Sequence, residues 1–389
     1  MHTAHIVGWG HTRFGRLDGQ DLESLILSAT GQALADAGIG AAEVDAVFLG
    51  HFNAGMVPDA FCASLPFGAD PAFRFKPATR LENACASGSA AIAAGLQAIA
   101  AGDARIVLVV GAEKMTAVSG AEVTAALAGA SYQKEEGARG LSFPGIFAQL
   151  AQGYFERHGD HARTLARIAS KNHTNGALNP LAHMQKALDV DFCDTVSERN
   201  PLIAAPLRKT DCSTVADGAA ALVLAHADLL PHFRRAVGFR AASHVNDFLP
   251  MSRRDVLAFE GPREAWRRAL VQAGIGVDGL SFAEVHDCFT IAELLSYEAM
   301  GLAAPGQGAR CLDEGTVYPD GRLPVNPSGG LKAKGHPVGA TGVSMHVLSA
   351  MQLCGEAGAL QLPSPTLAGI FNMGGAAVAN YVNVLERSR

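Results

Sequence analysis

Charge and aromatic side chains are scarce in this sequence. Charged residues make up 17% of its 389 positions, aromatic residues make up 6%, and the net charge is -6. A protein that binds nucleic acid needs a basic face, and a solvated tail needs a run of like charge. The sequence has neither, so we expect no nucleic acid partner. Hydrophobic residues make up 49% of the chain, which is enough to bury a large core.

Paired cysteines and targeting signals are also lacking. The seven cysteines form no C-x-x-C pair, which argues against a disulfide framework or a structural zinc site. The opening residues, MHTAHIVGWGHTRFG, show no basic segment followed by an apolar core, and we find no uninterrupted apolar run long enough to cross a bilayer. We therefore expect a cytoplasmic protein that has no membrane partner.

What the sequence does contain is a faint internal repeat. The stretch "ALADAGIG" at 33–40 is echoed by "ALVQAGIG" at 269–276. Each copy ends a helical pattern and leads into a predicted strand, at 46–52 in the first copy and at 282–289 in the second. The repeat predicts two βα halves that resemble each other.

The likeness extends to two apolar helices that are rich in small residues, predicted at 84–100 and 338–353. Each follows a Gly/Ser/Thr-rich turn and precedes a predicted strand, at 104–113 and 367–375. Small residues on every side allow close approach from all directions, which is typical of helices buried between layers. We expect a layered α/β fold in which the two halves pack together.

Between the halves the strand pattern stops, and it resumes at 217–225. The interval contains charged and Gly-rich turns around helical stretches, as expected of a domain inserted over a site. We predict an N-terminal half at 1–113 and 211–240, a loop or lid domain at 114–210, and a C-terminal half at 241–389.

Cys85 and His336 are the first candidates for chemistry. Cys85 lies in "ENACASGSAAI", where a turn gives way to a helix whose free N–H groups and dipole would lower the pKa of the thiol. His336 lies in "GGLKAKGHPVGATG", where flanking glycines let a substrate approach the imidazole. The structural alternative for Cys85 is a small buried hydrophobic residue, and the alternative for His336 is a turn histidine held by a structural hydrogen bond. Together, however, a thiol and an imidazole form the minimal activated nucleophile.

Two other segments offer polar groups at the ends of strands. In "FNMGGAAVAN", Gly374 and Gly375 could present N–H groups to an oxyanion, although a bulge or tight turn explains a glycine pair equally well. In "EVHDCFT", His286, Asp287 and Cys288 are consecutive. Neighbouring strand residues alternate faces, so zinc binding by these three is disfavoured.

These motifs, in this order, resemble the thiolase family. The carriers of the resemblance are "CASGSAAI", "HDCF", "NPSGGLKAKGHPVGATG" and the Gly-rich terminal strand, and they resemble the sterol-carrier-protein type of thiolase. The resemblance implies two similar halves in a layered α/β/α/β/α arrangement with an inserted loop domain. It also implies a homodimer or homotetramer, and acyl-CoA and coenzyme A as substrates, with no separate cofactor and no metal. The 389 residues include no sterol carrier domain, so we do not expect a lipid or sterol substrate.

The resemblance further implies a ping-pong transfer of acyl groups between 3-oxoacyl-CoA and coenzyme A, or the reverse Claisen condensation. By position, Cys85 would be the acylated nucleophile, and His336 would take its proton and then help hold a thioester oxygen. His286 would contribute to that first oxyanion site. The N–H groups of Cys85 and Gly374 would form a second oxyanion site, and Ser213 would contact the pantetheine arm.

The sequence departs from many thiolases in one place. Where those enzymes have a second catalytic cysteine in a C-x-G motif, this chain has Asn372-Met373-Gly374. In sterol-carrier-type thiolases the cysteine of "HDCF" takes over that work, so Cys288 is the predicted acid/base group, and Asp287 is expected to anchor the loop. The alternative is that Cys288 only packs beside Phe289.

Two other functions remain open at this point. Cys85, His286 and His336 also match the Cys-His-His set of decarboxylating ketosynthases, which need no second thiol. Alternatively, the chain could be an acyl-transfer subunit that depends on a small accessory protein.

Overall fold

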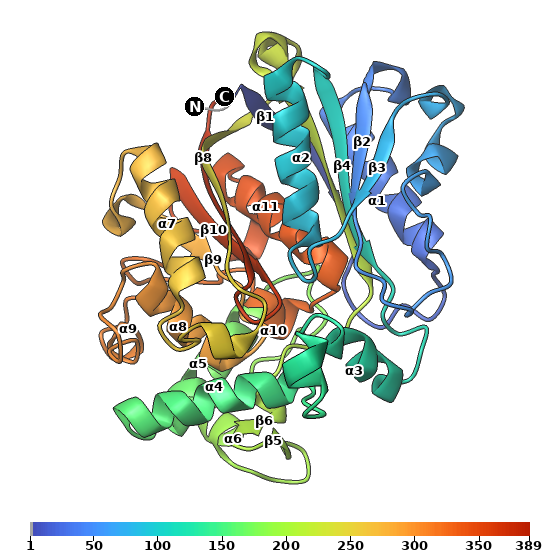
Figure 1. The fold of residues 1–389 in the computed structure, drawn as a ribbon. Coiled ribbons are helices and arrows are strands. Elements are labelled where there is room, and N and C mark those ends of the chain that lie inside the picture. The colour runs from blue at the N-terminus through green and yellow to red at the C-terminus, as the bar shows by residue number, and fades with distance from the viewer. Residues whose placement is uncertain (1–2) are drawn as a thin grey trace.

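The computed structural model describes residues 3–389. Figure 1 shows two α/β halves side by side, with helices between and outside their strands and a layer of helices and loops below them. The N-terminal half contains β1 (Ala4–His11), α1 (Leu22–Ala37), β2 (Ala46–Gly50), β3 (Ala78–Leu81), α2 (Ser87–Ala101), β4 (Ile106–Glu113) and β7 (Gly218–His226). The C-terminal half contains β8 (Val237–Asn246), α7 (Glu260–Ala273), β9 (Phe282–Glu284), α8 (Thr290–Ala299), α9 (Arg310–Asp313), α10 (Gly330–Lys334), α11 (Val338–Cys354), β10 (Leu367–Gly374) and β11 (Ala379–Arg387).

The strands form one mixed sheet in the order β3-β2-β4-β7-β1-β8-β11-β10-β9. Strands β3 to β1 in this order come from the N-terminal half, and strands β8 to β9 come from the C-terminal half. Among the described residues, the strands of the two halves pair with each other only where β1 runs antiparallel to β8, with His5 opposite Gly238. Since β8 begins at Val237, the predicted domain boundary between residues 240 and 241 falls inside this strand.

The predicted internal repeat corresponds to matching helix ends. α1 and α7 each end at a glycine in the left-handed conformation, Gly38 with φ of +72° and Gly274 with φ of +67°. A glycine adopts this conformation without the steric cost that a Cβ would add, which explains why "AGIG" recurs there. After this cap, each half returns to its sheet through a short connection.

The two helices rich in small residues lie in the middle of the molecule. α11 packs against α2, against β4 and β7 of the N-terminal half, and against β10 and β11 of the C-terminal half. Residues Ala84–Ala101, which include α2, are apolar enough to pass for a membrane span by length and composition, contrary to the sequence expectation. In the fold, however, 56% of that stretch is buried, and α2 packs on β2, β4 and α11. It is a core helix of this fold.

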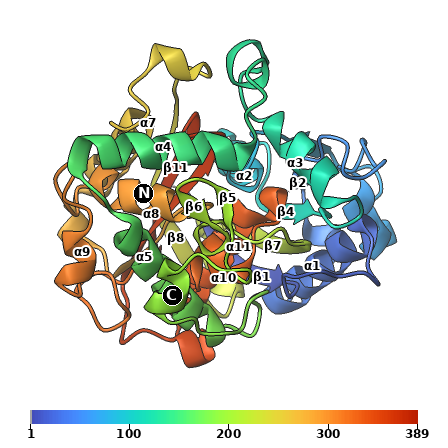
Figure 2. The same cartoon turned by 90° about the horizontal axis from the view of Figure 1, so that it is seen from below.

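The inserted segment covers one end of both halves. It comprises α3 (Gly120–Ala128), α4 (Phe143–His158), α5 (Ala162–Ala177), α6 (Val190–Asp194), β5 (Leu202–Ala204) and β6 (Leu207–Arg208). Figure 2, seen from below, shows α4 lying across the other elements with α3 at its side. The Phe147 ring of α4 stacks on Phe289 at 4.5 Å between centroids, which ties the insertion to the "HDCF" loop.

Candidate active site

Cys85 lies in a tight turn between β3 and α2. Ala84, directly before it, has φ of +50°, in the left-handed region that residues with a side chain rarely adopt. The Ser87 hydroxyl holds the turn, because it accepts from the Asn83 N–H at 2.9 Å and donates to the Ala84 carbonyl at 2.6 Å. The backbone is thus held in a strained conformation next to the candidate nucleophile, as is frequent in active sites.

The acidity of the Cys85 thiol differs from the sequence expectation. Burial and the nearby Glu113 carboxylate raise the pKa of Cys85 to about 12, although a hydrogen bond from the Gly375 N–H opposes the rise. The start of α2 was expected to lower this pKa. Because Cys85 is only 4% exposed, the cost of desolvating a thiolate outweighs the helix dipole. The resting group is therefore a thiol, and a base must remove its proton before it can attack.

His336, in the loop between α10 and α11, is a base with its lone pair free. Its Nδ1 lies 2.7 Å from the Thr341 hydroxyl, which donates its single hydrogen to the Pro337 carbonyl at 3.0 Å. The hydroxyl must therefore accept from the His336 Nδ1–H. Burial and then the charge of Lys334 lower the pKa of His336 to about 3, so the ring is neutral. Its buried Nε2 has no hydrogen-bond partner within residues 3–389.

Cys85, His286 and His336 converge from three distant parts of the chain. The Cys85 sulfur and one imidazole nitrogen from each histidine all lie within 4.8 Å of one another. The imidazoles meet edge to face, with centroids 5.1 Å apart. Three such groups could ligate a metal ion, and they also place a base and a second polar group beside a nucleophile.

His286 lies just beyond the end of β9 and is fully buried. Its Nδ1 is 2.8 Å from the Asn372 side-chain nitrogen, and its Nε2 has no partner in the described part of the chain. Burial, and then the neighbouring His336 and Lys334, lower the pKa of His286 well below its usual value. From the sequence, Asn372 was notable only because it replaces a catalytic cysteine, and its contact with His286 was not expected.

Asp287 holds the loop that carries His336. Its carboxylate accepts from the Leu331 N–H at 2.6 Å and the Lys332 N–H at 3.2 Å, both in α10, and from the Asn172 amide at 2.7 Å. Burial and then the Glu293 carboxylate raise the pKa of Asp287 to about 7. These contacts are those of the anchoring residue that the sequence suggested.

Cys288 lines the same cavity as Cys85 and His336. The cavity has a volume of about 120 Å³, and its remaining wall is mostly apolar, with Met115, Val123, Leu127, Phe143 and Phe289 among its residues. Burial, and then Cys85 and Asp287, raise the pKa of Cys288 well above that of a free thiol. Ser213 also lines the cavity, and its N–H donates to the Cys288 carbonyl at 2.9 Å. Both positions are compatible with the predicted roles.

Gly374 lies against the turn that carries Cys85. A Cβ at this position would lie 2.2 Å from the Asn83 carbonyl oxygen, so only glycine allows this approach. The next backbone N–H, that of Gly375, acts to lower the pKa of the Cys85 thiol. The glycine pair that the sequence singled out is therefore part of the Cys85 environment.

The sequence of this chain matches one family over nearly its whole length. The thiolase N-terminal domain matches residues 4–228, and the thiolase C-terminal domain-like family matches residues 243–387. The chain belongs to the thiolase family.

Individual relatives agree with this membership. An acetyl-CoA acetyltransferase from Methanothermobacter thermautotrophicus is 34% identical, and the match covers 100% of both chains. Sterol carrier protein 2 from Oryctolagus cuniculus is 33% identical over 96% of this chain and 70% of its own length. Among solved structures, the Ltp2-ChsH2(DUF35) aldolase is similar in fold, with a TM-score of 0.84 at 19% identity, covering 100% of this chain and 98% of its own. Human mitochondrial 3-ketoacyl-CoA thiolase in complex with CoA has a TM-score of 0.75 at 17% identity, covering 100% of this chain and 98% of its own.

Proposed function

We propose that this thiolase-type acyltransferase carries its acyl group on Cys85 and exchanges it between 3-oxoacyl-CoA and coenzyme A. The observation that carries the proposal is the position of the neutral His336, with a free Nε2 lone pair, beside the buried Cys85 thiol. The similarity to an acetyl-CoA acetyltransferase along the full length supports a coenzyme A thioester as substrate.

In the direction of cleavage, His336 accepts the Cys85 proton while the sulfur attacks the 3-oxo carbon. The bond between C2 and C3 then breaks, and its electron pair stays on C2 as the enolate of the shorter acyl-CoA. The thioester oxygen of this enolate is held by His286 and by the protonated His336, and the oxygen on the acylated carbon is held by the N–H groups of Cys85 and Gly374. Coenzyme A then takes the acyl group from Cys85, and the released sulfur recovers its proton from His336.

Cys288 supplies the proton that the enolate needs at C2. Its raised pKa keeps it protonated at neutral pH, so the resting thiol is an acid ready to donate. The thiolate left behind can take the proton of the incoming coenzyme A thiol, which restores Cys288 and activates the second nucleophile. Condensation uses the same steps in reverse.

The acyl-enzyme is the direct test of this mechanism. After brief treatment with acetyl-CoA or acetoacetyl-CoA, the intact protein should gain one acetyl group, and peptide mapping should place it on Cys85. An adduct on Cys288 or Cys62 with Cys85 unmodified would contradict the assignment. Loading without turnover until an accessory protein is added would instead support an acyl-transfer subunit.

A decarboxylating condensing enzyme is the second candidate, favoured by one observation. The close cluster contains Cys85, His286 and His336, whereas Cys288 contributes only to the surrounding cavity. Release of carbon dioxide from malonyl-CoA, unaffected by Cys288→Ala, would establish this alternative. Absence of that release together with cleavage of acetoacetyl-CoA would exclude it.

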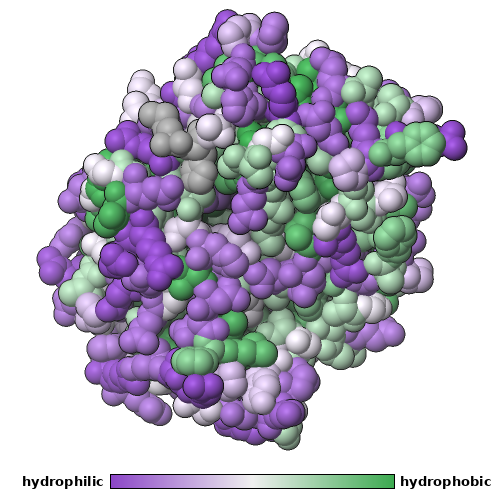
Figure 3. All heavy atoms as spheres, turned by 45° about the horizontal axis from the view of Figure 1, so that its top comes forward, coloured by the Kyte–Doolittle hydropathy of each residue, from purple (hydrophilic) through white to green (hydrophobic). Residues whose placement is uncertain are grey.

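We also infer that the chain self-associates, as a dimer or a tetramer. β3 forms an edge of the sheet, and Phe61 and Phe75 in the segment before it are 83% and 86% exposed. Figure 3 shows hydrophilic and hydrophobic residues interspersed over one face of the protein. Sedimentation at micromolar concentration should show no dominant monomer, and Phe61→Ser with Phe75→Ser should weaken the assembly. A fully active monomer would refute this inference.

A further inference from the structure

Asn372, at the end of β10, lies where three buried polar groups meet. Its side-chain nitrogen is 3.2 Å from the Cys85 carbonyl oxygen and 2.8 Å from the His286 Nδ1, and its side-chain oxygen is 2.7 Å from the Ser89 hydroxyl. A carbonyl oxygen only accepts hydrogen bonds, so the group that faces Cys85 must be the amide NH₂. The Cys85 carbonyl thereby fixes the orientation of the Asn372 amide.

This orientation decides which nitrogen of His286 holds the proton. The amide NH₂ donates to Nδ1, so Nδ1 must present a lone pair. Burial and the neighbouring His336 keep the pKa of His286 well below its usual value, so the ring is neutral and has one N–H, which must be at Nε2. That Nε2 is buried and has no partner among the described residues, and one nitrogen of the same ring lies within 4.8 Å of the Cys85 sulfur.

The two histidines of the site are therefore held in opposite tautomers. Thr341 gives His336 a bare Nε2, which is a base, whereas Asn372 gives His286 a protonated Nε2, which is a hydrogen-bond donor. We propose that Asn372 is a positioning residue that fixes His286 as the N–H donor to the enolate oxygen. This inference rests on the proposed function. It assigns a role to Asn372, which stands where many thiolases have their second catalytic cysteine.

The proposed task concerns one step of the reaction. When the α C–H bond of a bound acetyl thioester breaks, the proton goes to the Cys288 thiolate and the electron pair moves onto the thioester oxygen. A His286 with its proton on Nδ1 would direct a lone pair at that oxygen and repel it. Loss of one oxyanion donor costs about 10²- to 10³-fold in rate.

Asn372→Asp and Asn372→Leu separate this role from a packing role. Aspartate has the shape of asparagine but can only accept, so it draws the proton of His286 to Nδ1 and turns Nε2 into a lone pair. Leucine removes the contact and leaves His286 free to keep its proton on Nε2. At pH 8.5, about two units above the ordinary pKa of an imidazole, α-proton exchange of acetyl-CoA in D₂O should fall about 10²- to 10³-fold in Asn372→Asp. It should fall less in Asn372→Leu, and acetyl loading of Cys85 should change little in either variant.

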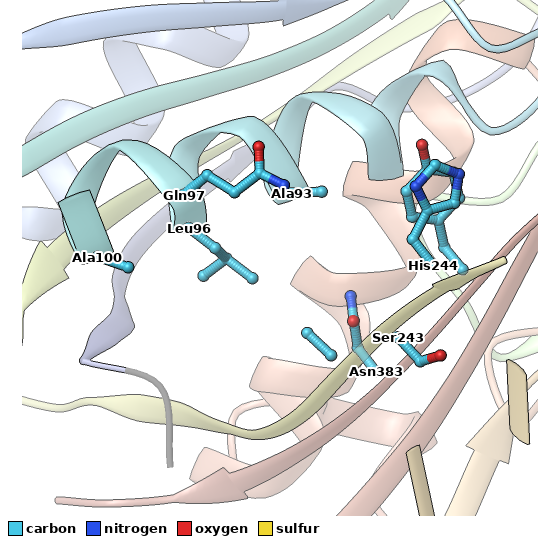
Figure 4. A pocket seen from close by; sticks show the side chains of 9 residues that line it. Ala93, Leu96, Gln97, Ala100, Ser243, His244 and Asn383 are labelled. Carbon is cyan, nitrogen blue, oxygen red and sulfur yellow. The ribbon is translucent and has the colours of Figure 1, made fainter. Parts of the chain in front are cut away.

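Asn383→Asp is the matched control. Asn383 donates through its side-chain nitrogen to the His346 Nε2 at 2.7 Å, and the His346 Nδ1 donates to the Gly342 carbonyl at 2.7 Å. Figure 4 shows Asn383 on the wall of a different cavity, of about 170 Å³, opposite Ala93 and Leu96 of α2. The same isosteric change in this buried pair should lower the melting temperature but leave the exchange rate within about threefold of the wild type, since no oxyanion donor is lost.

The tautomer of His286 can also be determined without an activity assay, from the ¹⁵N NMR spectrum of the protein with labelled histidine. The His286 signals are assigned as those that disappear in His286→Gln. We expect a protonated Nε2 in the wild type and a protonated Nδ1 in Asn372→Asp. A wild type with its proton on Nδ1, or an Asn372→Leu variant that exchanges as slowly as Asn372→Asp, would overturn the inference. A wild type that shows the expected tautomer but neither loads acetyl groups nor exchanges α-protons would instead refute the proposed function.

Discussion

Replacement of Cys288 by alanine tests the division of labour between the two thiols of the cavity. Cys288 is 3% exposed and lines the wall beside Cys85 and His336, so the change removes one buried sulfur atom and adds nothing. Deletion of a single buried heavy atom typically costs about 0.5–1.5 kcal/mol of folding stability. The variant should therefore fold, with a modestly lower melting temperature.

The effect on catalysis should be much larger and confined to the carbon–carbon step. Asn372 cannot transfer a proton in place of the thiol, because an amide does not ionise near neutral pH. Loss of a positioned acid/base group costs about 10²- to 10⁴-fold, which corresponds to about 3–5 kcal/mol of transition-state stabilisation. Loading of Cys85 from acetyl-CoA relies on His336 and backbone donors, so it should stay near the wild-type rate.

The assay follows acyl loading by intact mass and acetoacetyl-CoA cleavage by absorbance on the same samples. Cys311→Ala is the matched control, because Cys311 is also 3% exposed but does not line the cavity. It should show the same small loss of stability and unchanged cleavage. Cleavage at the wild-type rate in Cys288→Ala would mean that Cys288 only packs in the wall and that another group moves the proton.

Three further predictions concern the groups around the nucleophile. Because the pKa of Cys85 is about 12, the thiolate fraction grows about tenfold per pH unit below that value. The rate at which iodoacetamide alkylates Cys85 should therefore rise about tenfold per pH unit up to pH 9 or beyond. An inflection of this rate between pH 5 and 8 would contradict the prediction. Thr341→Val removes the acceptor that holds the imidazole base, so acetyl loading should fall about 10- to 100-fold with little change in KM; an unchanged loading rate would show that the tautomer is set elsewhere. Gly374→Ala places a Cβ 2.2 Å from the Asn83 carbonyl and should cost about 1–3 kcal/mol of stability and most of the loading rate. Gly31→Ala, at a helical position with open space around it, should leave the loading rate unchanged and should not lower stability, since alanine is favoured over glycine inside a helix, and an equal loss in that variant would refute the packing argument.

The architecture was accessible from the sequence because it depends on repeated local patterns. The small-residue helices, the strands that follow them and the glycine caps recur at matching places in both halves, so the pattern predicts the layers that the fold shows. The strand predicted over 282–289 is the exception, since β9 ends at Glu284. Val285 donates its N–H to the Asn326 side chain at 2.8 Å instead of to a neighbouring strand, a contact that alternating hydrophobicity does not reveal.

The detailed chemistry of the site was less accessible, because it depends on contacts between distant residues. The motifs identified Cys85, His286 and His336, and the structure brings all three together. The acidity of Cys85 could not be read from its helix, since burial outweighs the dipole only when the other layers are in place. The contact between Asn372 and His286 joins side chains 86 positions apart, so only the assembled fold reveals it.

The thiols and imidazoles of the assembled site are uncharged before substrate binds, and this determines how the site must work. Burial keeps the thiols of Cys85 and Cys288 protonated and the rings of His286 and His336 neutral, so no ion pair exists among the four groups before substrate binds. Charge separation between Cys85 and His336 is unfavourable until a carbonyl oxygen lies ready to take up the negative charge, because burial disfavours an isolated thiolate. The same burial strengthens each N–H donor directed at that oxygen. Near neutral pH, the thiol should therefore react readily with an acyl-CoA held in place but only slowly with small electrophiles that bring no oxygen for the donors to hold.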